Sequence, residues 1–384
     1  GSQVPNIRDI RATISEAARF YTDLVAEGAR MGALDIGGGL AIDYDGSHTN
    51  FASSANYDIQ EYCADVVEGA MRACDEAGVP HPTLISESGR AIVGYYSVLL
   101  INVIDTARFE VTEIPGNIPE DIPEALENLI EVARSLSAKN LQEYFHDALY
   151  YRDEIHAAFR HGDVTLRQRA LADQIFWYIL TRLSDEVRKM KIAPQELRGI
   201  ESALADVYYC NFSVFQSVPD AWAVDQLFPI MPIHRLREKP TRLGYLSDIT
   251  CDCDGKIDAF IDPHDVKTAL PLHPVSRGDE YILGIFLVGA YQETLGDLHN
   301  LFGDTNAVSI RVDEDGEVEY TQELRGDSVG DVLSYVEYNP ASLMEQFRAL
   351  AEDAVKQKQI TAADRRTILP AYENSLRGYT YFES

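Results

Sequence analysis

Gly37, Gly38 and Gly39 directly follow a short apolar run over residues 32–36. Because glycine has no Cβ, a triplet lets the backbone approach a ligand closely, and its exposed amides suit a phosphate. The same pattern also fits a tight turn between a strand and a helix. It is not a dinucleotide-binding motif, because Ile42 stands where the third glycine is required, and it is not a phosphate loop ending in Gly-Lys-Ser/Thr.

Glu87, Gly89 and Arg90 follow a second apolar run, residues 83–86, in the same way. In parallel barrels the carboxyl ends of the strands form the ligand-binding face. A glutamate there can hold a protonated pyridine nitrogen, while a glycine amide and a guanidinium can bind a phosphate. The plain alternative is a surface ion pair at the start of a helix.

The stretch Cys251-Asp252-Cys253-Asp254 places two thiols among carboxylates, directly before a glycine. Counting back from that glycine puts a threonine at the first ligand position of a helix-loop-helix calcium loop, which excludes this type of site. Zinc is disfavoured because the two cysteines are one residue apart and lack partners at suitable spacing. On a strand Cys251 and Asp252 would face opposite ways, whereas a loop could present them together.

Tyr291 follows the apolar run 281–288 and two small residues, a break that exposes a tyrosine hydroxyl at the end of a strand. Packing of this ring in the core is the ordinary alternative.

The elements that must position these groups begin with alternating helices and strands. Apolar residues recur at steps of three and four over residues 6–29 and a second helix is expected at 56–77, with strand-like runs at 32–36 and 83–86. This order predicts a parallel α/β sheet or barrel over residues 1–96.

Beyond the barrel part, we predict a β-domain (97–117 and 209–327) interrupted by an α-helical insertion (118–208) and followed by C-terminal helices (328–384). Strands are expected at 97–105, 109–114, 244–250, 257–261, 281–288, 307–312 and 317–322. Asp315-Gly316 is a typical hairpin turn between the last two.

Composition limits the classes of partner. The net charge of −29 over 384 residues argues against a nucleic-acid or anionic membrane surface, and it is compatible with a cationic substrate. Five cysteines, an odd number, predict free thiols in a reducing compartment, so we expect a cytoplasmic protein without a signal peptide. The apolar runs of about ten residues are too short to span a bilayer.

In their order along the chain, the four groups resemble the alanine-racemase-like family of pyridoxal-phosphate decarboxylases, in which a cofactor-binding barrel adjoins a β-domain. This resemblance implies that residues 1–96 are the C-terminal part of a (β/α)8 barrel. The resemblance is strongest to the biosynthetic arginine decarboxylases. It rests on residues 34–46 (LDIGGGLAIDYDG), 211–217 (NFSVFQS) and 284–304. The helical insertion also looks like that subgroup's, whereas the smaller ornithine and diaminopimelate decarboxylases lack it.

The resemblance implies roles for single residues. Glu87 would pair with the pyridine nitrogen of pyridoxal 5'-phosphate, Cys251 would be the general acid, and Asp252 and Asp254 would bind the distal cation of the substrate. In this family the cysteine and its neighbour cross a dimer interface, so a homo-oligomer is implied. The phosphate would be held by Gly37, Gly38, Gly39, Gly89, Arg90 and Tyr291.

The chain departs from the family in its lysines. Members bind the cofactor through a lysine on an early barrel strand, but the first lysine here is Lys139, within the helical insertion. The opening Gly1-Ser2-Gln3 looks like an internal stretch of the family. We therefore expect the N-terminal barrel half to be a separate chain, a cleaved product or a truncated piece, and the chain alone to be inactive.

The activity implied is decarboxylation of L-arginine to agmatine and CO2 for polyamine synthesis, with a magnesium requirement whose ligands no cluster in the sequence identifies. Two alternatives stay open. The substrate could be lysine, ornithine or a carboxylated polyamine, or the chain could be a non-catalytic regulatory homologue. The presence of Glu87, Arg90, Cys251 and Tyr291 together argues against the second.

Overall fold

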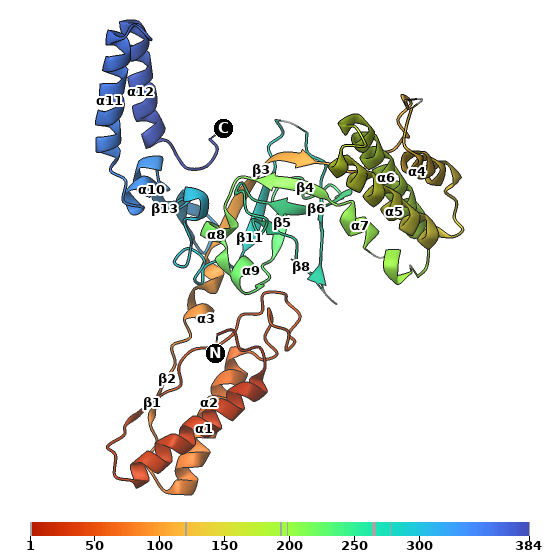
Figure 1. Ribbon diagram of the computed structural model, residues 1–384. Coiled ribbons are helices and arrows are strands. Elements are labelled where there is room, and N and C mark those ends of the chain that lie inside the picture. Colours follow the sequence, from red (N-terminus) through yellow and green to blue (C-terminus); the bar gives the residue numbers. More distant parts are fainter. Residues whose placement is uncertain are drawn as a thin grey trace.

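The computed structural model describes residues 2–119, 121–192, 194–197, 199–262, 266–276 and 278–383, so Gly1 lies outside the described residues. A central sheet carries three extensions (Figure 1): the barrel part with α1 and α2, the helical insertion with α4, α5 and α6, and the C-terminal helices α10, α11 and α12.

The barrel part contains two helices and two short parallel strands. Helix α1 (Ile7–Ala26) is capped by Asn6, whose side chain accepts a hydrogen bond from the Arg8 amide. The remaining elements are β1 (Ala33–Asp35), α2 (Ile59–Ala77) and β2 (Thr83–Ile85). Strands β1 and β2 pair in parallel, Ala33 opposite Thr83, which confirms the predicted parallel α/β arrangement.

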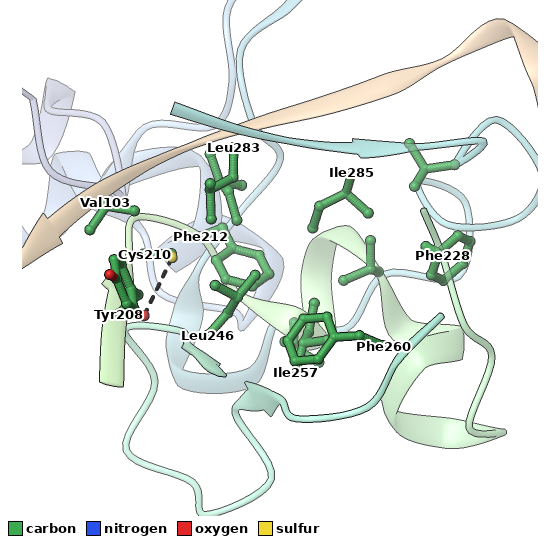
Figure 2. Packing of buried hydrophobic residues seen from close by; sticks show 14 of the residues in the cluster. Val103, Tyr208, Cys210, Phe212, Phe228, Leu246, Ile257, Phe260, Leu283 and Ile285 are labelled. Atoms are coloured by element: carbon green, nitrogen blue, oxygen red, sulfur yellow. Dashed lines mark hydrogen bonds between the residues drawn. The ribbon is translucent and has the colours of Figure 1, made fainter. Parts of the chain in front are cut away.

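Seven strands form the main sheet. Along the sheet the order is β10-β6-β4-β3-β11-β5, with β7 paired to β6, and the pairs are antiparallel except β4 with β6. Its strands are β3 (Val98–Ala107), β4 (Asp206–Cys210), β5 (Ile230–Pro232), β6 (Arg242–Ser247), β7 (Lys256–Ile257), β10 (Leu270–Leu272) and β11 (Ile282–Phe286). Figure 2 shows the core on this sheet, formed by Leu246, Leu283 and Ile285. Phe212, which follows β4, and Ile257 of β7 pack in the same core.

The helical insertion joins two neighbouring strands, β3 and β4. It consists of α4 (Glu124–Ser135), α5 (Leu141–His161), α6 (Leu166–Val187) and α7 (Ile200–Ala203). Thr165 and Gln168 form a capping box at the start of α6. The bundle has its own core, in which Leu126, Ile155 and Ile179 are fully buried.

Two sequence predictions in this region are wrong. Residues 109–114 form no strand: Phe109 packs on Trp177 with ring centroids 4.9 Å apart, and the Val111 amide donates to Thr181 Oγ1 at 3.3 Å. Contacts with α6 thus replace strand pairing. The helical pattern also does not extend to residue 208, because β4 begins at Asp206 and pairs with β3.

The predicted strand 257–261 divides into β7 and β8 (Phe260–Ile261), and β8 pairs with β9 (Val266–Lys267). The predicted hairpin is confirmed as β12 (Ala307–Val312) and β13 (Val318–Leu324), with Gly316 at φ +85° in its turn. Short helical turns complete the chain: α3 (Gly89–Val93), η1 (Gly94–Tyr96), η2 (Gln195–Leu197), α8 (Val214–Ser217), α9 (Pro219–Ala223) and η3 (His299–Leu301).

The chain ends in α10 (Val329–Tyr335), α11 (Pro340–Lys356) and α12 (Ala362–Arg377), as the helical pattern predicted. After α12 it returns to the sheet domain, where the buried Tyr381 donates to the Gly303 carbonyl at 2.8 Å and stacks on Phe302. Among the described residues, no helix combines the length and the apolar character that a membrane span needs.

Gly244 in β6 has no room for a side chain. An added Cβ would lie 2.4 Å from Tyr208 Cε2, and Tyr208 is fully buried. We therefore expect Gly244→Ala to lower the free energy of unfolding by about 1–3 kcal/mol or more, because the buried ring must move. Urea denaturation measures the change. Gly116→Ala is the matched control, since its methyl would meet nothing within 4 Å; equal stability of the two variants would contradict the prediction.

Candidate active site

The turns after β1 and β2 lie side by side because the two strands are parallel neighbours. The Ile36 amide donates to the Ile85 carbonyl and the Glu87 amide donates to the Gly37 carbonyl, both at 2.9 Å. A Cβ on Gly38 would lie 3.9 Å from the Cβ of Glu87. Strand pairing therefore brings the glycine triplet and the Glu87 turn together at one edge.

The glycine turn has backbone geometry that favours glycine. Gly37 has φ +70° and Gly39 has φ +103°, both in the left-handed region. The Gly39 carbonyl accepts from the Val4 amide at 3.0 Å, and the Gln3 side chain binds both backbone groups of Ile42. The first described residues of the chain therefore line this turn.

Tyr291 joins the site from the end of β11. Its hydroxyl lies 3.3 Å from where a Cβ on Gly89 would stand, and its ring lies 5.1 Å from the Arg90 guanidinium carbon. The tyrosine has φ +69° and is partly exposed, so it is not the core residue of the ordinary alternative.

Arg90 is the centre of this group, which we call the Arg90 cluster: Gly37, Gly38, Gly39, Glu87, Gly89, Arg90 and Tyr291. The side chain is 9% exposed, and Nη1 donates to the Tyr44 hydroxyl at 2.8 Å. Nη2 donates to Ser2 Oγ at 3.3 Å and lies 3.7 Å from an Asp220 carboxylate oxygen. Nε is buried and has no hydrogen-bond partner in the protein.

An unpaired guanidinium N–H in the interior is costly unless a further acceptor binds there. A phosphate beside glycine turns supplies such an acceptor, and its charge suits the guanidinium. The glycines, Arg90 and Tyr291 of the Arg90 cluster therefore fit the phosphate of pyridoxal 5'-phosphate, and the Glu87 carboxylate beside them does not take part in binding it.

Two partners of Arg90 were missed in the sequence. Burial raises the pKa of the Tyr44 phenol, and the hydrogen bond donated by Arg90 opposes this shift, so the phenol stays a neutral acceptor. Asp220 in α9 is held by Gln292, which is 1% exposed: the Asp220 amide donates to Gln292 Oε1 at 3.1 Å, and Gln292 Nε2 donates to the carboxylate at 2.8 Å. The one sequence signal for these residues was that Gln292 directly follows the candidate site residue Tyr291.

Cys251, Asp252 and Asp254 lie on an exposed loop between β6 and β7. The sequence left open whether these residues lie on a strand or in a loop, and the structure shows a loop. The Cys251 thiol accepts from Asn300 Nδ2 at 3.4 Å, and Asp252 lies 3.6 Å from His299 Nε2. Ligand atoms of Asp252, Cys253 and Asp254 lie within 4.8 Å of one another, as exposed acidic groups commonly do without a metal ion.

Three protein-family models match the chain: a pyridoxal-binding domain of pyridoxal-dependent decarboxylases (residues 1–94), the arginine decarboxylase helical bundle (119–201) and the arginine decarboxylase C-terminal helical extension (329–382). The biosynthetic arginine decarboxylase of Thermosynechococcus vestitus is 48% identical over the whole of this chain, and that of Bacteroides thetaiotaomicron is 44% identical.

Over its whole length the chain is similar to the biosynthetic arginine decarboxylases. The crystal structure of the Campylobacter jejuni family member SpeA superposes on all of this chain with a TM-score of 0.83 at 30% identity. The chain covers 60% and 61% of the two sequence relatives and 62% of the Campylobacter chain, so it spans about three fifths of a typical family member. The resemblance read from the sequence and its fold class are confirmed.

Gln292→Ala should lower the free energy of unfolding by about 1–3 kcal/mol, because it leaves the Asp220 carboxylate and amide without their buried partner. Urea denaturation of the chain measures the loss. Glu293→Ala is the control, since the neighbouring Glu293 is exposed. If both variants unfold at the same urea concentration, the Gln292–Asp220 bonds are not stabilising.

Proposed function

We propose that this chain is part of a pyridoxal-phosphate-dependent arginine decarboxylase, the part that holds the cofactor's phosphate and supplies the acid that completes the reaction. The observation that carries the proposal is the buried, partly unpaired Arg90 between two glycine-containing turns and Tyr291. Identity to arginine decarboxylases over the whole chain supports arginine as the substrate and agmatine and CO2 as the products.

The cluster residues have separate tasks in this proposal. Gly37, Gly38, Gly39 and Gly89 offer backbone amides to the phosphate, and Arg90 and Tyr291 bind it with a cation and a hydroxyl. Glu87 holds a proton on the pyridine nitrogen. The cofactor, when bound, supplies an electron-withdrawing ring that accepts the electron pair left when the bond to the carboxylate breaks.

The loop residues act on the substrate. Asp252 and Asp254 bind its distal guanidinium through charge-assisted hydrogen bonds. After CO2 leaves, the Cys251 thiol donates its proton to the α-carbon, and the resulting thiolate regains a proton from solvent. We further propose, as the family resemblance implies, that this loop serves the site of a second copy, which makes the enzyme a homo-oligomer.

We also propose that the cofactor lysine and the other barrel strands come from an N-terminal half of the enzyme, which is a separate chain, a cleaved product or the rest of a longer protein. The sequence has no lysine before Lys139. Parallel strands are normally covered on both faces, yet β2 leaves Ile85 44% exposed. The helices beside it expose Phe20 (65%), Val67 (49%) and Met71 (45%). This apolar surface fits the remaining half of a barrel.

We also propose a cytoplasmic location, a magnesium requirement and a division of the chain into four parts. The five cysteines are free in the structure, which agrees with a reducing, cytoplasmic location. A magnesium requirement rests on the family resemblance alone. The proposed division is barrel part (1–96), β-domain (97–117 and 209–327), helical insertion (118–208) and C-terminal helices (328–384), except that β4, which begins at Asp206, belongs to the sheet.

The proposal is tested by coexpressing this chain with a polypeptide that covers the N-terminal barrel half. The complex should bind pyridoxal phosphate, turn yellow and release agmatine from L-arginine. Ornithine and lysine are the substrate controls. A colourless complex would support the non-catalytic alternative, and faster turnover of ornithine or lysine would reassign the substrate.

Arg90→Ala should weaken binding of pyridoxal phosphate to that complex by about 10- to 100-fold, because one charge-assisted contact to the phosphate is lost. Fluorescence titration measures the affinity. Binding of pyridoxal, which lacks the phosphate, should not change. Arg19→Ala is the control, since Arg19 pairs with Asp23 on the exposed face of α1; unchanged phosphate-ester affinity would remove Arg90 from the site.

Cys251→Ala should reduce agmatine formation by about 100-fold or more, because the α-carbon loses its proton donor, while cofactor affinity stays nearly constant. Steady-state turnover and cofactor titration measure the two effects. The neighbouring exposed thiol gives the control Cys253→Ala, which should keep most of the activity. Near-normal turnover of Cys251→Ala would show that the proton comes from another group.

A further inference from the structure

We propose that Asp248 is a positioning residue for Cys251, a role that rests on the function proposed above for the cysteine. Asp248 lies three residues before the thiol, directly after β6, and is 3% exposed. Among the described residues, no Lys, Arg or His nitrogen lies within ion-pair distance of its carboxylate. A buried carboxylate without a cation must be satisfied by hydrogen-bond donors.

The donors come first from the cysteine loop itself. Asp248 Oδ1 accepts from the Thr250 amide at 2.8 Å and from the Thr250 hydroxyl at 2.7 Å. The Asp248 amide donates to the Gly255 carbonyl at 2.8 Å. Asp248 therefore binds both ends of the segment 250–255 and closes it into a loop.

The second oxygen ties this loop to another element. Asp248 Oδ2 accepts from the Val214 amide at 2.8 Å, at the start of α8, and the Ile249 amide donates to the Phe212 carbonyl at 3.2 Å. Helix α9, which follows α8, carries Asp220 beside Arg90. One carboxylate thus links the loop of the proposed acid to α8, and the helix after it, α9, reaches Arg90.

Gly255 shows how little space the loop leaves. An added Cβ would lie 2.3 Å from both Asp248 Oδ1 and Thr250 Oγ1. On the outer side Cys251 touches Asn300, while Cys251 to Asp254 remain exposed. The loop is therefore rigid at its base and open at its tip, the geometry that a thiol needs to reach a substrate in a fixed direction.

Asparagine at position 248 is nearly the same size but has only one oxygen for the three donors. Asp248→Asn should therefore release the loop. Thr250→Val removes the hydroxyl donor and keeps the carboxylate, so it is a milder second variant if Asp248→Asn does not fold. Asp258→Asn is the matched control, because Asp258 is exposed and binds Lys256 on the surface.

The first measurement uses this chain alone and needs neither cofactor nor partner. In a Cys253→Ser background, the alkylation rate of Cys251 by iodoacetamide should rise by about fivefold or more in Asp248→Asn and Thr250→Val. Cys63, an exposed thiol on α2, is the internal reference and should not change. A Cys251 rate within about twofold of the parent in both folded variants would overturn the proposal.

The second measurement uses the complex with the N-terminal half. Asp248→Asn should lower kcat by about tenfold or more in the parent background and have almost no further effect on Cys251→Ala, because a residue that acts through Cys251 has nothing left to position. Losses that multiply in the double variant would point to general destabilisation and overturn the proposal. Faster alkylation in a complex without decarboxylase activity would support the positioning by Asp248 and contradict the proposed function.

Discussion

The burial of one guanidinium, that of Arg90, is the constraint on which the candidate site depends. A buried cation is costly without a carboxylate and further acceptors. Its neighbours come from three parts of the chain: Ser2 and Tyr44 from the barrel part, Asp220 from α9, and Tyr291 from the turn after β11. The charge therefore holds the barrel part against the sheet domain, and its buried Nε has no hydrogen-bond partner in the protein.

The parallel pairing of β1 and β2 is the second requirement. Each strand has only three residues, yet their register aligns the following turns, so that the Glu87 amide reaches the Gly37 carbonyl. Backbone hydrogen bonds in this way bring together residues fifty positions apart. Around these strands an apolar surface stays uncovered, with Ile85 of β2 44% exposed.

The two remaining parts of the chain have separate cores. The helical insertion follows β3 and precedes β4 in the chain, and its helices bury their apolar residues against one another. Strands β3 and β4 still pair with each other. The segment after α12 returns to the sheet domain through Tyr381 and binds next to η3, whose Asn300 touches Cys251. The helical insertion and the C-terminal helices therefore contribute no residue to the Arg90 cluster, and the segment after α12 packs next to η3.

The sequence alone determined the local elements and the chemical types of the site residues. Helical periodicity located α1, α2 and the bundle, because this signal depends on neighbours within four residues. It did not determine the conformation of residues 109–114, which look like a strand but form none, with Phe109 packed on Trp177. It also did not reveal the roles of Tyr44, Asp220 and Gln292. Those roles arise from contacts between residues 46 to 130 positions apart, and only the tertiary structure decides which buried polar groups meet.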